Sequence, residues 1–143
     1  MRVFIDTNIL IDWYRAERPG NTLAKTILSV AGTDAYDIYI STQSIVDSAY
    51  SLKKLGVKLQ QFSDSLRHLR AVAHIVGIDE LDLSWALEHD SGDFEDDIQY
   101  ACAYNNVCDY FITRDKALLL RSEDPLCPMT VISPEDFVAA MTE

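Results

Sequence analysis

The chain has 143 residues, of which 48% are hydrophobic and 24% are charged. This length suits one domain with a buried core, and the composition excludes disordered and fibrous proteins. The 12 basic and 23 acidic residues give a formal net charge of -11, whereas a passive nucleic-acid binder carries an excess of lysine and arginine. A chain this acidic suits a protein that gathers carboxylates and neutralises them with a divalent cation.

We expect a single domain over residues 1–143, because no repeat, low-complexity tract or proline-rich linker divides the sequence. No apolar run approaches the ~20 residues that cross a bilayer, and the start MRVFID lacks the parts of a signal peptide. The sequence therefore predicts a cytoplasmic protein without membrane contact. Neither the cysteines nor the scattered histidines have metal-binding spacing, and we interpret them as structural residues: Cys102, Cys108, Cys127, His68, His74 and His89.

Strands and helices alternate along the first half of the chain. Val3 to Ile5 is an apolar strand core, and apolar residues then recur at helical spacing until Arg18-Pro19-Gly20 breaks the pattern. The same reasoning predicts helices over 21–30, 42–55 and 58–72 and strands over 36–40 and 74–78.

The alternation continues to the carboxyl terminus. Helices are predicted over 82–89, 93–105 and 116–121, and strands over 110–113 and 129–132. A last helix begins at Ser133-Pro134-Glu135-Asp136, which offers a hydroxyl cap, a proline at the first position and an acid at the third. Short apolar strands that alternate with helices indicate an α/β fold with a central parallel sheet of about five strands, covered on both faces.

Carboxylates follow the ends of several predicted strands. Asp6 comes directly after the first strand, Asp47 lies nearly two turns into the helix after the second, and Asp115 follows the fourth. Asp93 and Asp96 begin the helix that precedes the fourth strand. Ligands of parallel sheets bind at the carboxyl ends of the strands, so we expect these acids to meet at one edge.

Clustered carboxylates repel one another unless a cation offsets their charge, and oxygen ligands favour Mg²⁺ or Mn²⁺. Thr7, Asn8 and Thr113 are short polar side chains that can hold such ligands in place. Each acid has another interpretation, because Asp93, Asp96 and Asp115 are also good helix caps and Asp47 also fits a solvated helix face. The coincidence of all of them favours a metal site.

Four stretches resemble the PIN-domain family, the metal-dependent ribonuclease fold that includes the VapC toxins. They are VFIDTNILID (3–12), ISTQSIVDSAY (40–50), DFEDDIQYACA (93–103) and YFITRD (110–115), and their order spans nearly the whole chain. The resemblance implies a PIN-like three-layer α/β/α domain. It also implies that Asp6, Asp96 and Asp115 are metal ligands, with Asp93 as a helper.

The resemblance implies a fourth catalytic acid at Asp47, where the family usually has glutamate. Aspartate is shorter by one methylene, so Asp47 is expected to act through a water. The implied reaction is hydrolysis of RNA phosphodiester bonds with Mg²⁺ or Mn²⁺, which leaves 5′-phosphate and 3′-hydroxyl ends. Arg114 and Arg121 are candidates for holding the RNA backbone, with ordinary surface arginines as the alternative.

The family further implies a homodimer and an antitoxin partner. Aromatic residues are candidates for the dimer contact or for the core: Trp13, Tyr14, Phe62, Tyr100 and Tyr104. Two other functions stay open at this point. One is a degenerate PIN module that binds RNA or protein without cleavage, which the Asp47 substitution favours. The other is an aspartyl phosphotransferase or phosphatase, which usually has D-x-D where this chain has Asp6-Thr7-Asn8.

Overall fold

Five parallel strands form one sheet at the centre of the computed structural model, which describes residues 1–121 and 128–142. The strand order is β3-β2-β1-β4-β5. The strands are β1 (Arg2–Ile5), β2 (Asp37–Ser41), β3 (His74–Val76), β4 (Tyr110–Ile112) and β5 (Thr130–Ile132). The helices are α1 (Thr7–Tyr14), α2 (Asn21–Leu28), α3 (Thr42–Lys54), α4 (Leu59–Val72), α5 (Glu80–Glu88), α6 (Phe94–Asn105), α7 (Lys116–Leu120) and α8 (Pro134–Met141).

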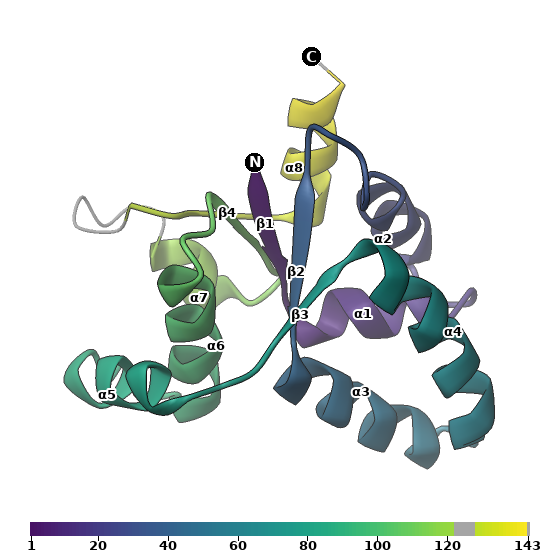
Figure 1. The fold of residues 1–143 in the computed structure, drawn as a ribbon, viewed down its shortest axis with the longest axis horizontal. Coiled ribbons are helices and arrows are strands. Elements are labelled where there is room, and N and C mark those ends of the chain that lie inside the picture. The colour runs from purple at the N-terminus through teal and green to yellow at the C-terminus, as the bar shows by residue number, and fades with distance from the viewer. Residues whose placement is uncertain (122–127, 143) are drawn as a thin grey trace.

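Helices cover both faces of the sheet, so the predicted three layers and parallel sheet are confirmed (Figure 1). Side chains alternate between the faces along β1. Val3 and Ile5 join the core cluster that is formed with residues of α1 to α4 and α8. Phe4 points to the other side, where it stacks on Phe111 with ring centroids 5.1 Å apart, and that cluster takes in residues of α5, α6 and α7.

The register of the sheet brings the ends of the central strands together. Val3 of β1 is aligned with Ile38 of β2 on one side and with Tyr110 of β4 on the other. The pairing of Ile5 with Ile112 continues into a hydrogen bond from the Asp6 amide to the Ile112 carbonyl, at 3.1 Å. The residues that follow β1 and β4 therefore start from neighbouring positions at the carboxyl edge.

Helix capping explains where the helices begin. Ser133 caps α8 as predicted, since its hydroxyl accepts a hydrogen bond from the Asp136 amide at 3.1 Å. Helix α5 begins at Glu80, two residues before its predicted start, because Asp79 caps it and accepts from the Asp82 amide at 3.3 Å. Strand β3 ends at Val76, also two residues short of the prediction.

The buried residues settle two further predictions. Phe62 and Tyr100 are buried in the core and Trp13 and Tyr14 pack against it, which leaves only Tyr104 of the aromatic candidates exposed. Cys102 and Cys108 are buried free thiols, and burial raises the pKa of both to about 12. Cys127 lies outside the described residues. Within those residues, every helix is too short or too polar to span a membrane.

Candidate active site

Asp6 is a buried carboxylate at the end of β1, only 8% exposed. It caps α1, and its Oδ1 accepts a hydrogen bond from the Thr7 amide at 2.8 Å. Its Oδ2 accepts from the Thr113 hydroxyl at 2.8 Å. Burial raises the pKa of Asp6, these two hydrogen bonds lower it, and the charge of Asp115 raises it further; the net shift is upward.

Thr113 joins Asp6 to the segment that carries Asp115. Its hydroxyl donates to Asp6 and accepts from the Asp115 amide at 3.0 Å. Asp115 itself caps α7, because its Oδ1 accepts from the amides of Ala117 and Leu118 at 2.9 and 3.1 Å. Capping and a place in the acid cluster are therefore compatible at Asp115, since Oδ1 makes both of these bonds.

Asp93 and Asp96 lie at the start of α6. Asp93 is the cap, and its Oδ1 accepts from the Asp96 amide at 3.1 Å. The pKa of Asp96 is raised to about 7, first by burial and then by the charges of Asp115, Asp93, Asp6 and Glu95. Acids from the ends of β1 and β4 and from the start of α6 thus lie close enough to repel one another.

Asp47 is linked to this cluster through a residue that the sequence reasoning missed. Its Oδ1 accepts from the Gln43 side chain at 2.9 Å. The pKa of Glu95 is raised by burial, then by contact with Asp47, and also by the charges of Asp93 and Asp6. Glu95 is thus a sixth acid of the cluster, beside Asp6, Asp47, Asp93, Asp96 and Asp115. The run DFEDD is the signal that could have drawn attention to it.

The chemistry of these side chains fits a hard divalent cation. All donors are carboxylate oxygens. Burial is the main cause of the raised pKa values of Asp6 and Asp96, and repulsion by neighbouring acids adds to it; a bound cation would relieve that repulsion. Over residues 1–121 and 128–142, however, no three acidic, histidine or cysteine side chains stand close enough to enclose an ion. The carboxylates gather at one place without forming a closed set of ligands.

A buried polar network lies beneath the acids. The Gln99 amide donates to the hydroxyls of Ser44 at 2.6 Å and Thr7 at 3.3 Å, and its oxygen accepts from Ser41 at 2.7 Å. Thr7 therefore supports Asp6 through its backbone amide, while its hydroxyl belongs to this network. Asn8 is exposed, and its supporting role stays a prediction.

The two arginines near the site are already paired with acids. Arg114 contacts Asp12, with Nη2 and Oδ2 2.6 Å apart, and Arg121 contacts Asp97. Both acids are almost fully buried, at 0% and 1% exposed. Neither arginine is a free surface cation, since each neutralises a buried carboxylate. Contact of these arginines with the RNA backbone stays a prediction.

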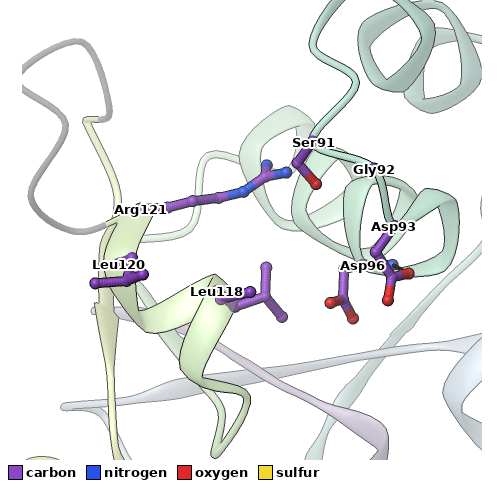
Figure 2. A pocket seen from close by; sticks show the side chains of 8 residues that line it. Ser91, Gly92, Asp93, Asp96, Leu118, Leu120 and Arg121 are labelled. Carbon is purple, nitrogen blue, oxygen red and sulfur yellow. Dashed lines mark hydrogen bonds between the residues drawn. The ribbon is translucent and has the colours of Figure 1, made fainter.

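A pocket of about 520 Å³ opens beside Asp93 and Asp96, between the start of α6 and helix α7. Leu118 and Leu120 line one side of it, and Arg121 reaches across toward Ser91 (Figure 2). The wall of the pocket is thus acidic at one end, apolar in the middle and formed by a paired guanidinium beyond that. The volume of the pocket lies in the range of small-molecule sites.

Several solved structures share this fold. The chain resembles the Mycobacterium tuberculosis toxin VapC20, which cleaves the sarcin-ricin loop, with TM-score 0.65, 14% identity and coverage of 90% of this chain and 98% of that one. It resembles a toxin–antitoxin complex from Klebsiella pneumoniae, with TM-score 0.64, 20% identity and coverage of 92% and 97%. VapBC2 from Rickettsia felis, bound to a promoter DNA fragment, gives TM-score 0.61, 14% identity and coverage of 93% and 98%.

Sequence comparison agrees with the fold. No curated protein sequence matches the chain, but the model of the PIN domain family matches residues 2–117. That match includes β1 to β4 and all the acids of the cluster. The chain therefore belongs to the PIN domain family.

Proposed function

We propose that this chain is an RNA endonuclease that requires Mg²⁺ or Mn²⁺ and acts in the cytoplasm as the toxin of a toxin–antitoxin pair. One observation carries the proposal. Asp6, Asp96 and Asp115 come from three separate segments, and the pKa of Asp96 rises to about 7 partly because the other two lie near it. In a PIN domain, such a gathering of oxygen ligands at the sheet edge supports a metal-dependent nuclease.

The acids would have different roles in metal binding according to their positions. Asp6 and Asp96 are the proposed direct ligands, with Asp115 and Asp93 completing the site. Asp47, which accepts a hydrogen bond from Gln43, and Glu95 would lie beside these ligands without binding the cation directly. A bound Mg²⁺ or Mn²⁺ would lower the pKa of a water and stabilise charge on the phosphoryl oxygens.

The pocket next to Asp96 is where we place a nucleotide adjoining the cleaved phosphate. Leu118 and Leu120 offer an apolar surface for the face of a base, and Asp93 and Asp96 lie at its other end. With Arg114 and Arg121 already paired, the phosphate would depend on the metal for charge neutralisation. Water attack at phosphorus would leave a 5′-phosphate and a 3′-hydroxyl.

An antitoxin and a second copy of the chain are the proposed protein partners. Two of the similar structures are toxin–antitoxin or VapBC complexes, which supports the first. Leu81 and Leu87 are exposed on α5, which offers apolar surface for the second. A small neighbouring reading frame that encodes a DNA-binding protein would support the toxin role.

Cleavage of end-labelled single-stranded RNA tests the activity. We expect cleavage with Mn²⁺ or Mg²⁺, none with EDTA, and a loss of at least about 100-fold in Asp6→Asn, which keeps the shape of the side chain but weakens its bond to a cation. Asp34→Asn, an exposed acid away from the site, is the matched control.

Two results would decide against the proposal in different ways. RNA cleavage that persists both in EDTA and in Asp6→Asn would reject a metal-dependent site at these residues. Binding of Mn²⁺ without any turnover would instead favour the degenerate PIN module that only binds RNA or protein.

A further inference from the structure

Asp12 is a fully buried carboxylate that binds two arginines. It lies on α1, six residues after Asp6, and is 0% exposed. Its Oδ1 is 2.6 Å from Nε of Arg18, and its Oδ2 is 2.6 Å from Nη2 of Arg114. A buried carboxylate needs such partners, since an unpaired charge in the interior is strongly unfavourable.

Arg114 lies between the two residues that tie β4 to the acid cluster. Thr113 before it donates to Asp6, and Asp115 after it raises the pKa of Asp6 and Asp96. The Arg114 side chain instead contacts Asp12 on α1. The loop of residues 113–115 is therefore held from two sides, by the Thr113 hydroxyl at the site and by the Arg114 guanidinium behind it.

The turn between α1 and α2 is shaped around this ion pair. A Cβ atom on Gly20 would lie 1.5 Å from Nη2 of Arg114 and 2.4 Å from Oδ2 of Asp12, so only glycine leaves room for both. Asn21 fixes the turn, because its side-chain amide donates to the carbonyls of Asp12 at 2.8 Å and Trp13 at 3.2 Å. The turn thus packs its backbone at Gly20 against the Arg114 guanidinium.

We infer that Arg114 is a positioning residue, whose ion pair with Asp12 fixes the 113–115 loop and thereby sets Asp115 relative to Asp6 for metal binding. The inference rests on the proposed function. Residues that hold metal ligands in place typically change metal affinity or activity by about 10–100-fold when removed. A residue that only stabilised the fold would lower the melting temperature and leave the metal affinity of the folded protein unchanged.

Two variants displace the guanidinium by independent means. Arg114→Met removes the charge and keeps the length of the side chain. Gly20→Ala keeps every charge and pushes the guanidinium out of its place, and the backbone of Gly20, with φ of -85°, accepts alanine. Arg114→Lys keeps the charge and should restore part of the affinity.

Two matched controls separate positioning from general damage. Arg18→Met removes the other arginine of the same carboxylate, the one that contacts Oδ1. Gly77→Ala introduces a methyl group that meets nothing within 4 Å.

The primary measurement is the Kd for Mn²⁺ without RNA, from the electron paramagnetic resonance signal of free Mn²⁺, at a temperature where thermal melting shows each variant folded. We expect Arg114→Met and Gly20→Ala to raise this Kd by about 10–100-fold. Both controls should stay within about twofold of the unchanged protein. In RNA cleavage at saturating Mn²⁺, the KM of Arg114→Met and Gly20→Ala for RNA should stay within about twofold of the KM of the unchanged protein.

Each other outcome overturns the inference. Unchanged Mn²⁺ affinity in Arg114→Met and Gly20→Ala, with normal binding and cleavage by the unchanged protein, rejects positioning and leaves the proposed function standing. A rise in the KM for RNA with unchanged Mn²⁺ affinity assigns Arg114 to RNA contact instead. An unchanged protein that neither binds Mn²⁺ nor cleaves RNA removes the proposed function itself.

Discussion

Asp96 lies in the first turn of α6, yet its pKa is raised, whereas a helix start usually lowers the pKa of an acid. The amides of the first turn normally favour a charged carboxylate. Here burial and four neighbouring acids outweigh that effect and raise the pKa of Asp96 to about 7. The side chain is thus partly protonated at neutral pH unless a cation is bound.

The raised pKa of Asp96 predicts a pH-dependent stability of the metal-free protein. The folded state binds the proton more tightly than the unfolded state, whose pKa lies near 3.8. This contribution to stability is therefore fully present below about pH 4 and is lost as the pH rises through about 7. In EDTA, we expect Asp96→Asn to raise the melting temperature at pH 8 and to have little effect at pH 4.5, measured by circular dichroism.

Asp34→Asn, at an exposed position, is the control for removing one negative charge. Addition of Mn²⁺ should stabilise the unchanged protein at pH 8 and should do less for Asp96→Asn. A melting temperature that Asp96→Asn lowers equally at both pH values would contradict the repulsion inferred here.

Hydrogen bonds between hydroxyl and amide groups join the helices to the edge of the sheet. Thr7 begins α1, Ser41 ends β2, Ser44 lies in the first turn of α3, and Gln99 lies on α6. Gln99 contacts all three hydroxyls and lies one turn after Asp96. The network fixes the ends from which Asp6 and Asp96 project.

Replacement of Gln99 by leucine should destabilise the fold. Leucine has a similar size but leaves the hydroxyls of Thr7, Ser41 and Ser44 short of partners in the interior. We expect a loss of about 1–3 kcal/mol in the free energy of unfolding, measured with urea. Gln60→Leu, on the exposed side of α4, should cost less than about 0.5 kcal/mol. Equal effects of the two substitutions would show that the network contributes little.

Over the whole molecule, charge works against RNA binding. The net charge is -11, and the two arginines nearest the acids are paired with Asp12 and Asp97. Few lysine and arginine side chains near the site are therefore left to displace counterions from the RNA backbone. Binding would depend on the divalent cation and on the pocket beside Asp96.

This charge distribution predicts a weak dependence on monovalent salt. Proteins that neutralise 6–10 phosphates lose about 10³–10⁵ in affinity between 50 and 200 mM salt. At saturating Mn²⁺, we expect kcat/KM of this protein for RNA to fall by less than about tenfold over the same range. A fall of 10³ or more would reveal a basic RNA surface that the residues near the acids do not provide.

Local pattern was sufficient for most of the fold. Alternation and apolar runs predicted the five strands, and capping residues such as Asp93 and Ser133 predicted helix starts to within about two residues. The start of α5 and the end of β3 differ from the prediction by two residues each. The predicted helix began at Asp82, whereas Asp79, three residues earlier, is the residue that caps α5.

Some residues of the candidate site could be predicted from the positions of the strand ends, and others depend on side-chain packing. Asp6 and Asp115 were predictable neighbours, because β1 and β4 end at the same edge of a parallel sheet. Glu95 was missed because its contact with Asp47 joins α6 to α3 across the fold. For Arg114 the sequence left RNA contact and an ordinary surface arginine open, because nothing local indicates that its side chain lies against Gly20 and is bound to Asp12.

The alternation of strands and helices, the helix caps and the carboxylates at strand ends follow from the sequence alone, since these depend on neighbours a few residues apart. The three-dimensional fold was needed to show which acids repel one another, which arginines are already neutralised and where the pocket opens. Those properties depend on burial and on contacts between segments as distant as Asp6 and Thr113, where the electrostatic cost of a buried charge must be met by partners from elsewhere in the chain.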